Sequence, residues 1–176
     1  MRKRMSAVLG IGATVTAVLC LWAVPAGAAT AGFETFSGFL IATGRTGDRQ
    51  VLATSLTATG VFKGHGRIVE VASRPGDTDD VLRDDLVFAA GTMHLGSTNL
   101  DSTFDIDPTT CRASFHADQV GEIDGGTGQF AHATGSLTGS VDGTALFARL
   151  TDHSCNLSRP PVIERDDVAA RGTLQF

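Results

Sequence analysis

The chain has 176 residues, enough for one domain with a substantial hydrophobic core and short for two. Apolar residues make up 42% and charged residues 19%, a balance that excludes a collagen-like or strongly charged disordered chain. The formal net charge is −5 and the basic residues beyond position 4 are scattered, so we expect no binding to nucleic acid.

The N-terminal segment has the pattern of a secretory signal peptide. Basic residues at positions 2 to 4 precede an almost unbroken apolar stretch over 7–24, and Pro25-Ala26-Gly27-Ala28-Ala29 follows. A basic start, an apolar middle and a small-residue end predict cleavage after Ala28. Loss of the three basic residues would leave an exported, extracellular chain of net charge −8. An uncleaved membrane anchor is the alternative, although the small residues argue against it and for no stable membrane insertion after cleavage.

Beyond residue 28 the sequence predicts strands rather than helices. Residues 100–107 alternate between two faces, one of them largely acidic, as a half-buried strand does. Residues 168–176 alternate in the same way, which predicts a docked strand at the C-terminus. The expected strands are 33–42, 50–58, 61–71, 84–90, 92–95, 100–107, 112–123, 136–141, 144–151 and 168–176.

Turns rich in glycine and aspartate separate these strands. They are expected at 44–48, 74–77, 124–126 and Asp142-Gly143. Many short strands joined by such turns predict a single all-β domain over 29–176, either a sandwich or a barrel. Some strands, such as 36–41, are apolar on both faces, so one face would line a core or cavity and the other would be covered.

Two cysteines remain after the expected cleavage. In an oxidising compartment Cys111 and Cys155 most simply form a disulfide bond. They lie 44 residues apart, a separation for which chain entropy gives about 4 kcal/mol of stabilisation. A reactive thiol is the alternative, but it would leave the second cysteine without a role.

The segment Gly125-Gly126-Thr127-Gly128-Gln129-Phe130-Ala131-His132-Ala133-Thr134-Gly135-Ser136 is the most distinctive in the chain. It resembles a glycine signature of the allene oxide cyclase and dirigent barrel superfamily. It is also similar to a group of small exported actinobacterial proteins, which carry one cysteine before this segment and another after it. The segments 58–62 and 88–92 resemble that group as well, so the resemblance covers most of residues 33–176.

The resemblance implies an eight-stranded antiparallel β-barrel with an apolar cavity, and often a homotrimer. Plant members of the superfamily cyclise a fatty-acid epoxide or orient phenoxy radicals during coupling. Their catalytic and pocket residues have no residue-by-residue match in this chain. A resemblance in fold therefore does not carry either activity over.

The glycine segment is better explained by architecture than by catalysis. Glycine permits a positive φ and close backbone approach, so Gly125, Gly126 and Gly128 suit a tight reversal. Gly135 would free the next bend, and Phe130 would anchor the corner in the core. A phosphate-binding loop is the alternative, but the lysine and the helix that it requires are missing.

Three polar residues are candidates for orienting a ligand inside the barrel. Strand alternation places Glu34, Asp84 and Gln119 each on the same face as large apolar residues. Polar groups that point into a barrel must be paired or hydrated, so the three could converge on a small ligand. Alternatively, they lie in water at the barrel rims.

The remaining groups of polar residues give little evidence for a metal site or a catalytic site. The acidic residues Asp77, Asp79, Asp80, Asp84 and Asp85 could supply oxygen ligands for calcium, but their spacing departs from that of an EF-hand loop and favours a solvated turn. The five histidines lack zinc-ligand spacing, and no nucleophile motif occurs, so neither a metal nor another cofactor is expected.

These observations favour an exported barrel that binds a small apolar molecule without catalysis, or that serves as an extracellular structural module. A cofactor-independent isomerase or cyclase is the alternative, acting through the shape of its cavity and a few polar groups. The interior of the barrel distinguishes these interpretations. A ligand or substrate needs an open cavity, whereas a structural module can fill its centre with side chains.

Overall fold

The computed structural model describes residues 29–78 and 80–176. The expected signal peptide, residues 1–28, lies outside the described residues. Over the part of the chain that the structure describes, no helix is long and apolar enough to cross a membrane. Within residues 29–78 and 80–176, one short 3-10 helix accompanies eight strands, so the all-β prediction is confirmed.

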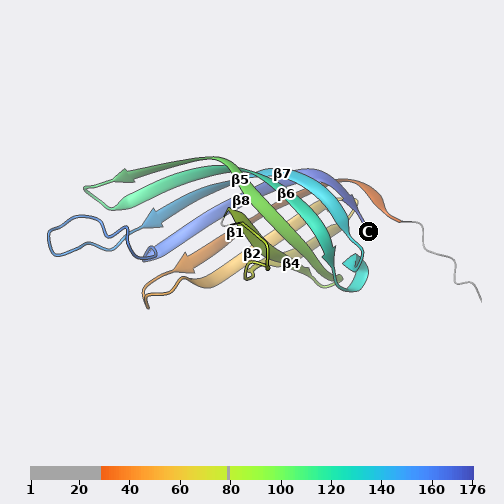
Figure 1. Ribbon diagram of the computed structural model, residues 1–176, viewed down its shortest axis with the longest axis horizontal. Helices are drawn as coiled ribbons and strands as arrows, with labels where there is room; N and C mark the ends of the chain where they lie inside the picture. Colours follow the sequence, from red (N-terminus) through yellow and green to blue (C-terminus); the bar gives the residue numbers. More distant parts are fainter. Residues whose placement is uncertain (1–28, 79) are drawn as a thin grey trace, which may run out of the picture.

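The eight strands close into an antiparallel barrel in which each strand pairs with its neighbours in sequence and the last pairs with the first (Figure 1). The expected eight-stranded antiparallel barrel is therefore present. The elements are β1 Ala31–Thr43, β2 Gln50–Gly60, β3 Lys63–Glu70, β4 Val81–Phe88, β5 Gly91–Asp107, β6 Arg112–Gly126, η1 Gly128–Phe130, β7 Thr134–Leu146 and β8 Ile163–Gln175.

The barrel has two unlike ends. At one end lie η1, the C-terminus and the turns after β2 and β4, and this is called the closed end (Figure 1). At the other lie the β1–β2 and β5–β6 connections and the long β7–β8 loop, and this is called the open end. Strands β3 and β4 have 8 residues each, against 17 in β5 and 15 in β6. The barrel wall is therefore uneven in height.

Four phenylalanines fill the closed end. Phe130 is fully buried, and its ring meets those of Phe62 and Phe176 edge-to-face at centroid distances of 5.0 and 5.2 Å. Phe88 joins the cluster through Phe62, also at 5.0 Å. Edge-to-face contacts of this kind add to the stabilisation that burial provides. The cluster seals this end of the barrel with side chains.

The strand predictions need two corrections. Residues 92–95 and 100–107 belong to one strand, β5, whose register with β6 shifts between Asn99 and Asp101. Residues 136–141 and 144–146 likewise belong to β7, so the turn expected at Asp142-Gly143 is wrong. A Cβ at Gly143 would collide with the ring of Phe115, which explains a glycine in mid-strand.

The glycine segment makes the reversal between β6 and β7, but later in the chain than the turn expected at 124–126. Gly125 and Gly126 are the last residues of β6, and the reversal itself passes through η1. Gly128 has φ 59°, and the carbonyl oxygen of Ala90 lies 2.6 Å from where its Cβ would be. A side chain is thus excluded there both by backbone conformation and by space.

Phe130 and Gly135 have distinct structural roles. Phe130 anchors the corner in the core, as expected. Gly135 lies within β7 rather than at a bend, so that expectation is wrong. Its Cα faces the carbonyl of Thr173 on β8 so closely that a Cβ would collide with it. The glycine permits close approach of two strands.

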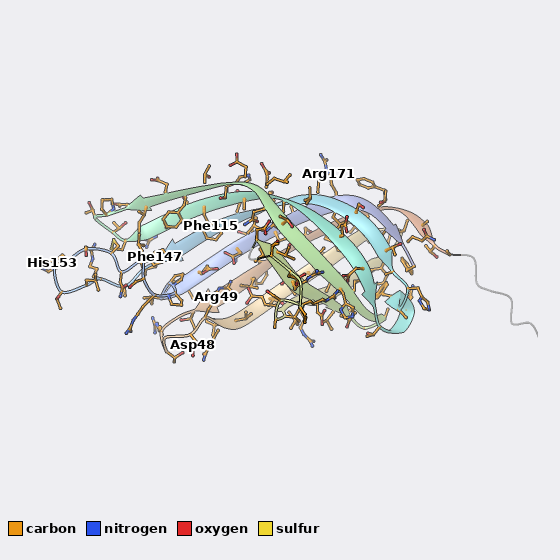
Figure 2. All side chains as sticks on the ribbon, in the orientation of Figure 1. Asp48, Arg49, Phe115, Phe147, His153 and Arg171 are labelled. Carbon is orange, nitrogen blue, oxygen red and sulfur yellow. A yellow bond between two sulfur atoms is a disulfide. The ribbon has the colours of Figure 1, made fainter. Side chains whose placement is uncertain are left out.

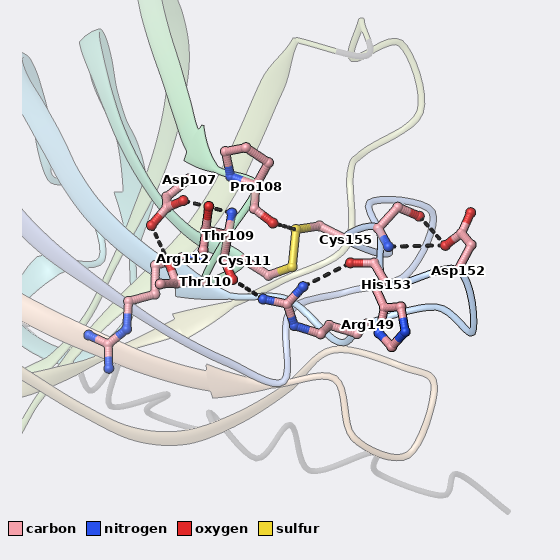
Figure 3. The surroundings of a disulfide bond; sticks show 11 residues. Asp107, Pro108, Thr109, Thr110, Cys111, Arg112, Arg149, Asp152, His153 and Cys155 are labelled. Carbon is pink, nitrogen blue, oxygen red and sulfur yellow. Dashed lines mark hydrogen bonds between the residues drawn. A yellow bond between two sulfur atoms is a disulfide. The ribbon is translucent and has the colours of Figure 1, made fainter.

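A disulfide bond joins Cys111 to Cys155 and fastens the open end (Figure 3). It ties the β5–β6 connection to the β7–β8 loop, and the two Cα atoms are 5.4 Å apart. Arg149 supports the same junction, because its guanidinium donates hydrogen bonds to the backbone oxygens of Thr109 and His153. The expected pairing of the two cysteines is confirmed.

Candidate functional site

A cavity of about 610 Å³ occupies the barrel between the phenylalanine cluster and the open end. Its wall is made largely of apolar side chains that alternate inward along the strands, among them Phe36, Leu40, Leu56, Ile68, Leu86 and Leu137. Small-molecule sites in proteins typically measure about 300–1,000 Å³. The interior is therefore roomy enough for a ligand, rather than packed like a structural core.

Two of the three polar residues singled out in the sequence line this cavity. They are Asp84 on β4 and Gln119 on β6. The Gln119 amide donates a hydrogen bond of 2.8 Å to the side-chain oxygen of Asn99 on β5, which also lines the cavity. Gln119 is thus already oriented by a neighbour. The environment of Asp84 instead consists of burial and the nearby charges of Glu70, Arg49 and Asp85, with no hydrogen bond from a described side chain.

Glu34 does not join them. It lies at the closed end and is fully buried. Its two carboxylate oxygens accept hydrogen bonds from the backbone N–H groups of Phe62, at 2.8 Å, and Thr35, at 3.1 Å. The bond from Phe62 holds the turn between β2 and β3, so Glu34 has a structural role, and it is not among the residues that line the cavity.

The cavity has a charged side that the sequence analysis missed. Arg49 precedes β2 and lines the cavity together with Phe115 of β6; both are labelled in Figure 2. Its guanidinium contacts three carboxylates from two strands: Glu70 on β3, and Glu164 and Asp166 on β8. The Nη2 atom is 2.9 Å from Glu164 Oε1 and 3.3 Å from Asp166 Oδ2.

Asp84 lies beside this charged group, because it pairs with Glu70 in the register of β4 and β3. With it, four carboxylates and one guanidinium line the same space. Burial raises the pKa of Asp84 to about 6, with a further contribution from the charge of Glu70, and Arg49 opposes the shift. A carboxyl group with this pKa exchanges protons near neutral pH.

Asp166 is the most buried of the four carboxylates, at 9% exposure. Its Oδ1 atom is buried and has no hydrogen-bond partner among the described residues. Burial raises its pKa, and the neighbouring Glu164 carboxylate raises it further, while Arg49 opposes both effects. An unpartnered polar atom in a protein interior is costly, so the position of Asp166 lowers the stability of the fold.

A sequence signal existed for part of this charged side. Glu164 and Asp166 have the same alternation phase as Val168 and Ala170, so extending the last strand toward residue 163 would have placed them inside the barrel. Arg49 gives no such signal. It lies in the connection before β2, and its direction depends on where the barrel closes.

The acidic residues of segment 77–85 have different partners and do not form one site. Asp77 accepts hydrogen bonds from Arg83, which lowers its pKa to about 2 with help from the Arg74 backbone. Asp84 faces the cavity, and Asp85 bonds to His94 at 2.7 Å. Asp79 lies outside the described residues. Within 29–78 and 80–176, no cluster of three histidine, cysteine, aspartate or glutamate side chains is arranged to hold a metal ion.

Comparisons of the chain with models of known protein families, with curated proteins and with solved structures gave no match. The function has to be inferred from the residues of the cavity.

Proposed function

We propose that this chain is an exported barrel protein that holds a small, largely apolar molecule in its interior and performs no reaction on it. The observation that carries the proposal is the cavity of about 610 Å³, walled by apolar side chains. Transfer of an apolar molecule from water into such a space is favourable in proportion to the apolar area covered. A barrel with only a structural role would gain stability by filling this space.

The N-terminal sequence and the disulfide bond support export. A basic start, an apolar stretch and small residues precede the described domain, as in the signal peptides that direct secretion. The bond between Cys111 and Cys155 is of a kind that persists in oxidising surroundings. The glycine segment 125–136 supports membership of the allene oxide cyclase and dirigent superfamily, which we propose as the origin of the fold.

A neutral fluorescent dye, N-phenyl-1-naphthylamine, tests the cavity. Residues 29–176 contain neither tryptophan nor tyrosine, so the protein contributes little fluorescence of its own. We expect dye emission to rise on binding at pH 7.5. The variant Ala170→Phe, which places a ring in the cavity, should weaken binding at least tenfold.

Ala169→Phe is the matched control, because it adds the same ring one residue earlier in β8, on the exposed face. It should leave dye affinity within about twofold of the wild-type value. Both variants are first checked for retained strand content by circular dichroism. Failure of the wild-type protein to bind the dye, or equal weakening by both variants, would contradict the proposed function.

A cofactor-independent isomerase or cyclase is a second candidate, favoured by one observation. Asp84 and Asp166 have raised pKa values inside an apolar cavity, where a carboxylic acid can donate a proton to a bound molecule near neutral pH. The test is incubation of an extract of the producing culture with wild-type protein and with Asp84→Asn, followed by mass spectrometry. Conversion of a compound by the wild type alone would favour catalysis over binding.

A further inference from the structure

The charged residues that line the cavity limit the chemical class of ligand that it can bind. Four carboxylates line it, those of Glu70, Asp84, Glu164 and Asp166, against the single guanidinium of Arg49. When these five groups are ionised, three negative charges remain uncompensated; His116, which also lines the cavity, contacts Asp142 and Asp118. Excess charge of one sign within a low-dielectric space favours a ligand of the opposite sign.

Arg49 is not available to an anionic ligand. Its Nη1 atom contacts Glu70, and its Nη2 atom contacts Glu164 and Asp166. An incoming carboxylate or phosphate would have to displace these partners and would meet the remaining acidic groups at close range. Arg49 therefore neutralises carboxylates of the protein itself rather than a charge on a ligand.

One carboxylate on the cavity side has no cation bonded to it among the described residues. Asp84 lines the cavity and makes no ion pair with any described residue, whereas Asp166 already accepts a hydrogen bond from Arg49 through its Oδ2 atom. Asp84 pairs with Glu70 in the register of β4 and β3, so two carboxylates adjoin here. A group with several N–H donors could bond to such acceptors, whereas an ether or a carbonyl could not.

We propose, resting on the proposed function, that the ligand is an amphiphilic amine whose apolar body lies against the cavity wall and whose ammonium group bonds to Asp84 among the acidic groups of the cavity. Hydrogen bonds to charged groups are stronger than those between neutral groups, so this pairing sets the selectivity of the cavity. The apolar wall supplies affinity that does not depend on charge.

Three probes with the same ten-carbon chain test the proposal: n-decylamine, n-decanol and n-decanoate. Isothermal titration calorimetry at pH 7.5 compares them below their solubility limits, where the amine is protonated. We expect the amine to bind at least tenfold more tightly than the alcohol, and the carboxylate to bind most weakly. Equal or tighter binding of the alcohol or the carboxylate would overturn the inferred charge preference while leaving the proposed binding function intact.

Charge-removing variants locate the contact. Asp166→Asn and Asp84→Asn keep the shape of each side chain and should each weaken decylamine binding roughly tenfold, with little effect on decanol. Asp167→Asn is the matched control, one residue along β8 and exposed. Unchanged decylamine affinity in Asp84→Asn would overturn the proposal. Absence of binding by all three probes would contradict the proposed function, and the amine proposal with it.

Discussion

The two ends of the barrel each bury a carboxylate, and the contrast between them is informative. At the closed end, Glu34 is fully buried and both of its oxygens accept backbone hydrogen bonds, from Phe62 and Thr35. Toward the open end, Asp166 is almost as buried, but one of its oxygens has no partner within the described part of the chain. The first carboxylate completes the fold, whereas the second leaves a bonding requirement unmet.

The surroundings of Glu34 and Asp166 also differ. Glu34 lies at the sealed end, where phenylalanine rings fill the barrel. Asp166 lies beside an open cavity with other acidic groups and one arginine. Burial alone therefore does not identify a functional carboxylate in this protein. The informative feature is burial without a partner, next to unfilled space.

Removal of the Phe130 ring should have the largest effect on stability. Phe130→Ala deletes a fully buried side chain at the centre of the closed end, and substitutions of this kind cost about 3–5 kcal/mol. Urea unfolding followed by circular dichroism measures the loss. Phe33→Ala is the control, because that ring is 60% exposed, and it should change stability by about 0.5 kcal/mol or less. A loss below about 1 kcal/mol for Phe130→Ala would show that the closed end is not a packed core.

Loss of the disulfide bond should have the next largest effect, at the opposite end. The double variant Cys111→Ser, Cys155→Ser opens a loop with a sequence separation of 44, and we expect a loss of about 2–4 kcal/mol. The same urea experiment measures it, and chemical reduction of the wild-type protein should reproduce it. Equal stability of the oxidised and reduced proteins would mean that the open end is held by its other contacts.

The sequence predicted the class of fold because alternation and turn residues are local signals. Residues 100–107 and 168–176 were recognised from their period of two, and all but Phe176 lie in strands β5 and β8 of the barrel. The boundaries within β5 and β7 were wrong. Pairing with the long strand β6 carries both strands through residues that resemble turns, because tertiary packing overrides local preference.

The candidate site was only partly predictable for a related reason. Asp84 and Gln119 could be placed on inward faces from alternation alone, and they do line the cavity. Glu34 has the same inward phase, but the phase does not reveal that it lies at the sealed end. Arg49 comes from a connection, whose direction is set by long-range closure rather than by neighbouring residues.

Replacement of Glu34 tests the structural side of the comparison. Glu34→Gln retains one oxygen acceptor but turns an N–H donor toward a backbone N–H, so one buried hydrogen bond is lost. We expect a loss of about 1–3 kcal/mol in urea unfolding at pH 7.5. Glu122→Gln, on the exposed face of β6, should be nearly neutral. An equal effect of both substitutions would remove the structural role assigned to Glu34.

Replacement of Asp84 should have the smallest effect on the free energy of unfolding, and it should increase stability rather than decrease it. The pKa of Asp84 is about 6 in the folded protein and about 4 in an unfolded chain, so between these values the folded state holds a proton that the unfolded state has lost. The stability contributed by this group therefore falls as the pH rises from 4 to 6, and the loss is complete above pH 6. Asp84→Asn escapes that loss because its side chain stays neutral.

We expect Asp84→Asn to be about 1–2 kcal/mol more stable than the wild type at pH 7.5 and equally stable at pH 4. The whole pKa difference between the folded and unfolded states corresponds to about 3 kcal/mol, and the partial exposure of the group reduces this value. Urea unfolding at a series of pH values measures the difference. Asp105→Asn, on an exposed part of β5, is the control and should change the free energy of unfolding at pH 7.5 by about 0.5 kcal/mol or less. Destabilisation by Asp84→Asn at pH 7.5 would mean that the carboxylate stabilises the fold as Glu34 does. Stabilisation would instead mark it as a group retained at a cost to the fold, as binding residues commonly are.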